Sequence, residues 1–143
     1  MTRIVKIEKT GGPEVLKLET VNLEKPDAQE VTIEHKAIGL NFIDIYHRTG
    51  LYPVELPSGL GGEGAGIIKE VGSKVEGFSV GDRVGYAGAP LGAYSSERNY
   101  PIKNLVKKNE LVAYKHNGFW QCMDTLRDKE LLNKLWNSGK FKW

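Results

Sequence analysis

Apolar and polar residues alternate in several short segments of the first three quarters of the chain. The alternation runs through Arg3–Ile7, Leu16–Val21 and Glu30–His35, with the period of strands that bury one face. Gly62–Val71 and Asp82–Tyr86 continue the pattern. Glycine and proline separate these segments and mark turns. We therefore expect a small, mostly antiparallel β barrel.

One helix is expected among these strands, over Asn41–Thr49. Asn41 is a residue type that caps a helix N-terminus, and Asp44 stands three positions later, where a carboxylate supports the first turn. Gly50 follows the segment and is suited to end it. The fold class predicted for this part is mainly β with some α.

The last quarter of the chain has a different pattern. Leu111–Tyr114 is predicted as a short strand, and Thr125 with Asp128 has the spacing of a capping box. The apolar residues that follow fall on one face of a helix: Leu131, Leu132, Leu135 and Trp136. We therefore divide the chain into a barrel over residues 1–107 and a C-terminal strand and helix over residues 108–143.

Composition and charge exclude several classes of partner. The 143 residues are 40% hydrophobic and 27% charged, a balance that supports a core and a soluble surface. The net charge of +2 is spread without a basic stripe, so no nucleic-acid partner is expected. No apolar run approaches the ~18 residues of a membrane span, and the single cysteine, Cys122, forms no internal disulfide. We expect a cytoplasmic protein without a membrane partner.

The stretch SGLGGEGAG, Ser58–Gly66, contains the glycine spacing of a dinucleotide-binding loop. Such a loop cradles a pyrophosphate only between a buried strand and a helix N-terminus. Here a segment with two prolines precedes the run, and a strand-like segment follows it. The glycines are therefore expected to let a strand pass close to neighbouring backbone.

A longer pattern resembles a known family. Gly61–Tyr86 resembles the G-H-E-x-x-G…V-G…G-D-R-V signature of the GroES-like catalytic domain of medium-chain dehydrogenases/reductases. Gly11–Glu19, Lys36–Pro53 and Gly92–Tyr100 are similar to its NADPH:quinone oxidoreductase branch, the zeta-crystallin-like proteins. The resemblance covers residues 1–106. It implies a GroES-like small β barrel and the reduction of quinones with NADPH.

The resemblance also implies a reaction without zinc. Zinc-dependent members hold their catalytic metal with a cysteine after the third strand and a histidine in the G-H-E motif. Here Gly39–Phe42 and Gly61–Glu63 stand in the corresponding stretches, and neither supplies a ligand of that type. The three histidines, His35, His47 and His116, are not grouped at ligand spacing. We therefore predict no metal site in the barrel.

The resemblance places the nicotinamide side of the cleft along five residues: Asn41, Phe42, Ile43, Asp44 and Ile45. It places Tyr46 and Tyr52 on the side of a quinone-type substrate, where their rings can stack on a flat acceptor. Two alternatives stay open. Asn41 is equally suited to cap the helix, and Tyr46 and Tyr52 are at least equally suited to pack within the barrel. For Asp44, support of the helix start is favoured over proton donation.

Residues 110–139 are similar to the C-terminal part of glucose-1-phosphate cytidylyltransferase, with H-N-G-F-W-Q as the most specific string. In that family the aspartate of the motif F-W-x-x-M-D-T helps to hold Mg²⁺, and Asp124 stands at that position here. One carboxylate does not make a magnesium site without phosphates and a second acid, so Asp124 and Thr125 are expected to begin a helix instead. The chain thus resembles a chimera.

The predicted function is that of the catalytic-domain portion of a zinc-independent NADPH:quinone oxidoreductase. The family's cofactor is held largely by a separate Rossmann domain, whose glycine-rich loop we do not find, so we expect this chain to be weakly active or inactive alone. An alternative is a non-enzymatic chimeric or interaction module, and a weaker one is sugar-nucleotide binding through the tail. An apolar barrel face without its partner domain favours a homo-oligomer.

Overall fold

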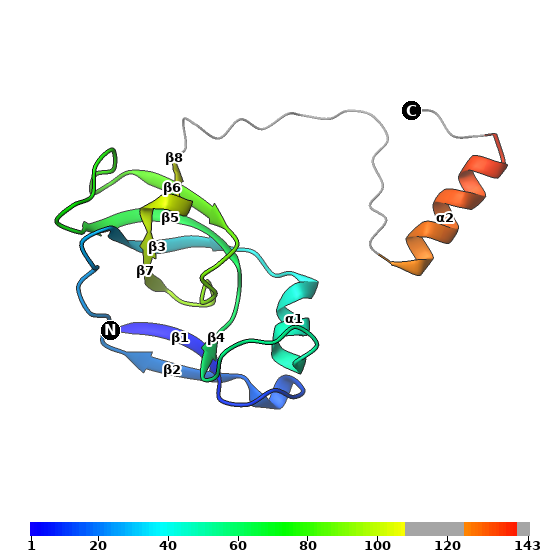
Figure 1. Ribbon diagram of the computed structural model, residues 1–143, viewed down its shortest axis with the longest axis horizontal. Helices are drawn as coiled ribbons and strands as arrows, with labels where there is room; N and C mark the ends of the chain where they lie inside the picture. Colours follow the sequence, from blue (N-terminus) through cyan, green and yellow to red (C-terminus); the bar gives the residue numbers. More distant parts are fainter. Residues whose placement is uncertain (108–124, 140–143) are drawn as a thin grey trace. The chain divides into compact units, whose positions relative to one another are not determined.

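The computed structural model describes residues 1–107 and 125–139. Contacts divide the chain into an N-terminal unit, Met1–Leu111, and a C-terminal unit, Val112–Trp143. All of the described strands lie in the N-terminal unit (Figure 1). The mainly β class with some α is therefore confirmed.

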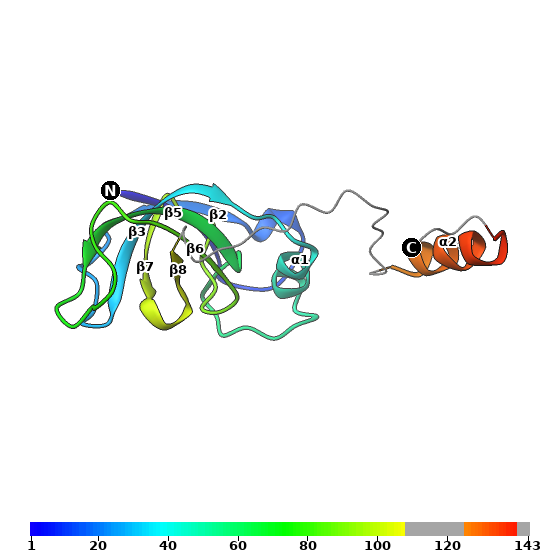
Figure 2. The same cartoon turned by 90° about the horizontal axis from the view of Figure 1, so that it is seen from above.

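The larger sheet has five antiparallel strands in the order β7-β3-β5-β6-β8. Their bounds are β3 Glu30–Ile38, β5 Glu63–Val71, β6 Arg83–Ala87, β7 Glu97–Pro101 and β8 Val106–Lys107. The longest ladder joins β3 to β5 and runs from the Val31–Val71 pair to the Ile38–Gly64 pair. In Figure 2 these strands curve together over one side of the unit.

The smaller sheet is also antiparallel, in the order β2-β1-β4, with β1 Thr2–Ile7, β2 Lys17–Val21 and β4 Ser58–Gly59. The short 3₁₀ helix η1, Pro13–Val15, precedes β2. The expectation of a barrel is wrong in one respect, since the described strands form two sheets and no closed ring of pairs. The two sheets are joined outside the ladders by two backbone hydrogen bonds of 2.8 Å, from the Val5 N–H to the Tyr94 carbonyl oxygen and from the Ser96 N–H to the Arg3 carbonyl oxygen.

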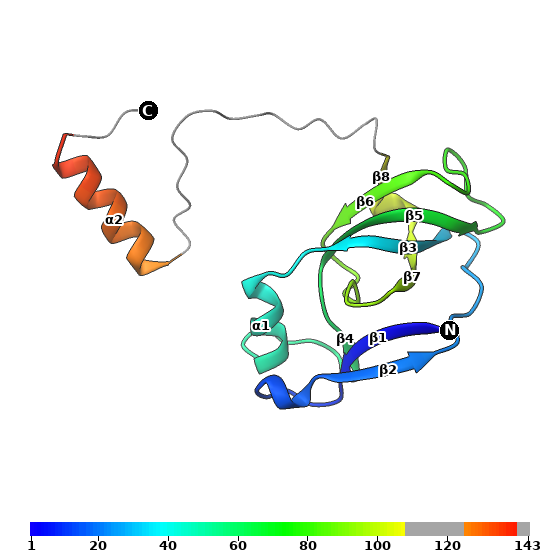
Figure 3. The same ribbon diagram turned by 180° about the vertical axis from the view of Figure 1, so that it is seen from behind.

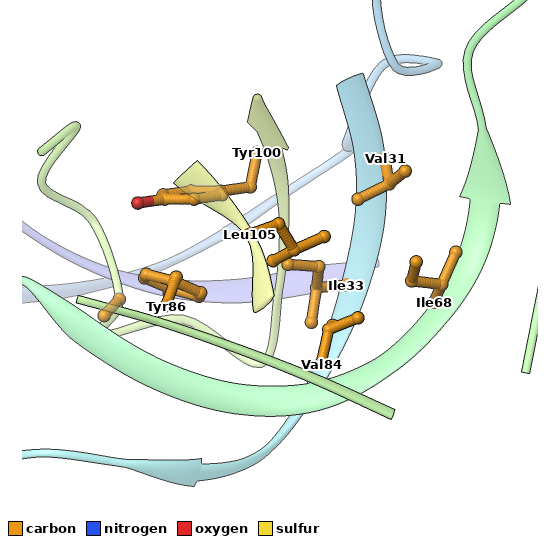
Figure 4. Packing of buried hydrophobic residues seen from close by; sticks show 8 residues of the cluster. Val31, Ile33, Ile68, Val84, Tyr86, Tyr100 and Leu105 are labelled. Carbon is orange, nitrogen blue, oxygen red and sulfur yellow. The ribbon is translucent and has the colours of Figure 1, made fainter. Parts of the chain in front are cut away.

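The core of the larger sheet is built by alternate positions of its strands, as the period of two requires. Its buried members are Val31, Ile33, Ile68, Val84, Tyr86, Ala93, Tyr100 and Leu105. Figure 4 shows the rings of Tyr86 and Tyr100 one above the other, with centroids 4.0 Å apart and planes at 27°. A second cluster of Ile7, Val15 and Leu60 lies against the smaller sheet.

Helix α1 runs from Phe42 to Thr49 and confirms the predicted helix. Asn41 is its N-cap residue, and the Asn41 N–H donates to Asp44 Oδ2 at 2.9 Å. Gly50 ends the helix at φ 84°, a left-handed conformation that favours glycine. Figure 3 shows α1 beside the ends of β3 and β4, and the Gly11 N–H donates to the Arg48 carbonyl oxygen at 2.9 Å.

Helix α2, Leu126–Asn137, belongs to the C-terminal unit and confirms the predicted tail helix. The Asp128 N–H donates to Thr125 Oγ1 at 3.2 Å, which is one half of the predicted capping box. Within the predicted apolar face, Leu132 and Leu135 are half-buried, whereas Leu131 and Trp136 are exposed. The strand predicted over residues 111–114 and the position of Asp124 lie outside the described residues. Neither described helix is long and apolar enough to cross a membrane.

Candidate functional site

The glycine run forms a strand, a sharp turn and the start of a second strand. A Cβ atom added at Gly59 would lie 2.8 Å from the Cα of Gly92, and one added at Gly61 would lie 2.5 Å from Cδ1 of Tyr94. The run is followed by β5 and by no helix. The predicted close approach to neighbouring backbone is confirmed at Gly59, whereas the neighbour of Gly61 is the ring of Tyr94.

A cleft of about 680 Å³ lies between α1, the loop that follows α1, the start of β5 and the segment that follows β6. Its lining residues are Asn41, Ile43, His47, Pro53, Val54, Gly62, Glu63, Gly88, Ala89 and Leu91. Most of them are apolar or glycine, and the polar groups are few. A concave, mostly apolar site with a few polar groups is typical of a small-molecule site.

The helix divides the predicted cofactor residues between two sides. Asn41 and Ile43 line the cleft, whereas Asp44 and Ile45 line a hollow of about 180 Å³ on another side of α1. Phe42 is 74% exposed. Consecutive helical residues are rotated by about 100°, so five of them cannot face one cleft. The binding of a nicotinamide by these residues stays a prediction.

Asp44 is the buried anchor of α1 and is only 3% exposed. Its Oδ2 atom accepts hydrogen bonds from the Asn41 N–H at 2.9 Å and from the Tyr94 hydroxyl at 2.8 Å. Burial and the bond to Asp44 raise the pKa of Tyr94 above its usual range. The predicted support of the helix start by Asp44 is therefore confirmed, and the same carboxylate ties α1 to the segment before β7.

Tyr46 and Tyr52 pack on each other, with ring centroids 5.4 Å apart and planes at 67°. The Tyr52 N–H also donates to the Tyr46 carbonyl oxygen at 3.1 Å. Their side chains are 37% and 47% exposed, and neither residue lines the 680 Å³ cleft. A place for them beside a quinone stays a prediction.

Comparison with known proteins identifies the domain. Residues 27–130 match the model of the alcohol dehydrogenase GroES-like domain. The chain belongs to this family. It is 54% identical over 96 residues to a quinone oxidoreductase of Pseudomonas aeruginosa, a match that covers 66% of this chain and 30% of that protein.

The GroES-like fold is shared with a solved structure of Escherichia coli quinone oxidoreductase complexed with NADPH. The TM-score is 0.71 at 49% identity, and the match covers 75% of this chain and 33% of that one. The chain thus spans about a third of the length of these relatives. A separate match of 43 residues is 54% identical to glucose-1-phosphate cytidylyltransferase of Salmonella typhimurium and covers 30% of this chain and 17% of that protein.

One wall of the cleft in the GroES-like domain is held by a buried arginine. The guanidinium carbon of Arg98 lies 4.8 Å from the ring centroid of Tyr100 and 5.4 Å from that of Tyr86. Arg98 Nη2 donates to the Leu91 carbonyl oxygen at 3.1 Å, and the Tyr100 hydroxyl donates to the Ala89 carbonyl oxygen at 3.2 Å. These core residues therefore fix two lining residues of the cleft.

Sequence reasoning missed this wall. Arg98 and Tyr100 lie on β7, which was not predicted, and Ala89 and Leu91 lie in a connecting segment. The alternation in E-R-N-Y, residues 97–100, was the one signal that indicated the strand. Arg98 occupies an inward-facing position of this strand, whereas the usual pattern of a half-buried strand places a charged residue on the exposed face.

His35 serves the core of the GroES-like domain. Its Nδ1 atom lies 2.7 Å from the Ser95 carbonyl oxygen and its Nε2 atom 2.7 Å from the Tyr86 hydroxyl. A carbonyl oxygen only accepts, so Nδ1 carries the proton and Nε2 accepts from Tyr86. Burial is the main cause that lowers the pKa of His35. This pairing gives His35 a structural role.

The two stretches compared above with the zinc-ligand motifs, Gly39–Phe42 and Gly61–Glu63, both contribute to the cleft. Asn41 and Gly62 both line it, and neither side chain is a usual zinc ligand. Within residues 1–107 and 125–139, no group of three or more histidine, cysteine or acidic residues is placed to hold a metal ion. His47 also lines the cleft, which no motif or spacing in the sequence indicates.

Proposed function

We propose that the 680 Å³ cleft is the acceptor site of an NADPH-dependent, zinc-independent quinone oxidoreductase, and that this chain carries its catalytic domain. The observation that supports this most is the meeting of Asn41 and Gly62 in one cleft. They belong to the two stretches, Gly39–Phe42 and Gly61–Glu63, that by resemblance correspond to the ligand motifs of the zinc-dependent members. The quinone oxidoreductase relatives named above agree with the assignment.

The cleft has the surface that a flat acceptor requires. The side chains of Ile43, Val54 and Leu91 line it and offer apolar contact, while Asn41 carries an amide that can hydrogen-bond a carboxamide or a ribose hydroxyl. NADPH, when bound, supplies the hydride. The protein orients the acceptor and excludes water from it.

The described residues fit the nicotinamide end of the cofactor better than its phosphates. A pyrophosphate is held where a glycine-rich turn leads from a strand into a helix. In the described N-terminal unit, β3 leads into α1 through residues 39–41, which contain one glycine and no glycine-rich turn of that kind. We therefore propose that this chain alone binds NADPH weakly and turns over slowly or not at all.

A non-enzymatic interaction module is the second candidate function, and one observation favours it. Large apolar side chains beside and within α1 are exposed, with Leu40 at 84%, Phe42 at 74% and Leu51 at 65%. Apolar surface of this kind is typical of a protein contact. This alternative predicts that the cleft itself has no affinity for a quinone.

A binding measurement separates the two candidates. We expect tetramethyl-1,4-benzoquinone, whose fully substituted ring does not alkylate thiols, to bind with a dissociation constant on the order of 1 mM. Ile43→Asp places a charge in the apolar cleft and should weaken binding at least about tenfold. Titration followed by methyl and amide NMR shifts measures both constants.

The matched control is Ile45→Asp, on the same helix. Ile43 and Ile45 are 43% and 42% exposed, but only Ile43 lines the cleft. The control should bind the quinone as the unmodified chain does. Equal losses in the two variants, or no saturable shifts in the unmodified chain, would reject the acceptor site.

A further inference from the structure

Two buried polar atoms of α1 have no hydrogen-bond partner in the part of the chain that the structure describes. They are Oδ1 of Asp44 and Nδ1 of His47. Buried polar atoms in folded proteins are almost always paired, and an exception calls for an explanation. Neither atom is used by the contacts that hold α1, which go through Oδ2 of Asp44.

The two residues stand three positions apart on the helix, so their side chains are neighbours on its surface. A helical side chain leans toward the N-terminus, which directs the His47 ring toward the turn that carries Asp44. A carboxylate oxygen accepts hydrogen bonds, and an imidazole nitrogen donates when it carries a proton. The structure has no hydrogen bond between the two atoms. A small rotation of the His47 ring, or one bridging water, would join Nδ1 to Oδ1 and satisfy both atoms.

His47 also reaches the cleft, which it lines together with Ile43 on the preceding turn. Its ring therefore extends from the buried side of α1 to the proposed acceptor site, and Nε2 is not among the buried unpartnered atoms. The ring of Tyr52 lies 6.1 Å from it, measured between centroids. The arrangement is that of an imidazole oriented by a carboxylate, with its second nitrogen available to a ligand.

We propose that Asp44 and His47 act as a pair in which Asp44 fixes the Nδ1 proton and His47 Nε2 protonates the oxygen of the reduced acceptor. The proposal rests on the proposed function of the cleft. In this proposal His47 is the catalytic residue of the pair, because its Nε2 would contact the acceptor in the cleft that His47 lines. Asp44 acts through His47 and is a positioning residue.

The reduction of a quinone by a hydride leaves one proton to be added, and His47 can supply it. A quinone that accepts a hydride gains two electrons and one hydrogen and becomes a hydroquinone monoanion. The Nε2–H bond of the His47 imidazolium then breaks, and the O–H bond of the hydroquinone forms. His47 is left neutral with its Nδ1 proton toward Asp44, and solvent returns the proton to Nε2.

Glu63 is the other ionisable side chain that lines the cleft, but its position differs. Its carboxyl group packs against Gly39, where a Cβ atom would overlap Oε1 of Glu63. No unpartnered buried atom of Glu63 is found in the described part of the chain. The observations therefore favour His47 over Glu63.

The tautomer of neutral His47 tests the pair without any cofactor. Long-range ¹H–¹⁵N correlation spectra at pH 8 show which ring nitrogen carries the proton, and we expect Nδ1 in the unmodified chain. Asp44→Asn should move the proton toward Nε2, because an amide can donate to Nδ1. Tyr94→Phe removes only the bond to Oδ2 and should leave the tautomer unchanged. A proton on Nε2 in the unmodified chain overturns the pair, even if Asp44→Asn does not fold.

Binding of the product tests the role of Nε2. Tetramethylhydroquinone donates a hydroxyl to neutral Nε2, so His47→Gln should weaken it about five- to tenfold and change the affinity for the parent quinone less than twofold. Equal effects on the two ligands overturn proton donation while the acceptor site stands. If neither ligand binds, both the proposed acceptor site and the proton-donor role of His47 are rejected. A proton on Nδ1 of His47 would still support the pairing of His47 with Asp44.

Discussion

Tyr100→Ala is expected to destabilise the N-terminal unit by about 4 kcal/mol, the cost of truncating a large buried ring. The side chain is fully buried. Its ring stacks on Tyr86 at 4.0 Å and lies 4.8 Å from the guanidinium carbon of Arg98. Urea unfolding of the variant and the unmodified chain measures the difference.

The matched control is Tyr100→Phe, which keeps the ring and removes only the hydroxyl. The bond from that hydroxyl to the Ala89 carbonyl oxygen is 3.2 Å long, so its loss should cost about 1 kcal/mol. If the phenylalanine variant lost as much stability as the alanine variant, the stacked rings would not be the source of the stability.

Gly66→Ala should destabilise the larger sheet by about 3 kcal/mol, at the upper end of the usual cost of overpacking. The added Cβ atom would overlap the Glu34 carbonyl oxygen and approach Cγ2 of Ile33 to 2.8 Å. Both belong to β3, whose backbone is fixed by its ladder to β5. Chemical unfolding of the variant measures the loss.

Gly85→Ala is the control for this substitution. Gly85 lies in the neighbouring strand β6, and its nearest atoms would be 3.8 Å from the new Cβ, an ordinary contact. The expected change in unfolding free energy is within about 0.5 kcal/mol. Similar losses at Gly66 and Gly85 would contradict close backbone approach as the reason for glycine at the end of the run.

The strands that alternate apolar and polar residues could be predicted, and the others could not. Val31, Ile33 and Ile68 are buried at alternate positions of their strands, as the pattern assumes, although Thr32 between the first two is buried as well. On β7 the inward positions are occupied by Arg98 and Tyr100. Because one of these buried residues is charged, the strand lacks the regular alternation of apolar and polar residues. β4 and β8 have two residues each and are too short to give a pattern.

The residues of the candidate site could be predicted from the sequence only where they belong to a family motif. The family resemblance pointed to Asn41 and Ile43 among the cofactor residues, and both line the cleft. Ala89 and Leu91 are placed by hydrogen bonds to Tyr100 and Arg98, which no local pattern contains. The separation of Ile43 from Ile45 follows from helical geometry, but the side that faces a cleft depends on the packing of α1.

The most direct test of the acceptor site is a set of intermolecular NOEs between the methyl groups of tetramethyl-1,4-benzoquinone and methyl-labelled protein. We expect NOEs to Ile43, Val54 and Leu91, which line one cleft. NOEs confined to Ile67 and Val106, which line a different hollow beside β6, would contradict it. So would a saturated sample without NOEs to any of the three cleft residues.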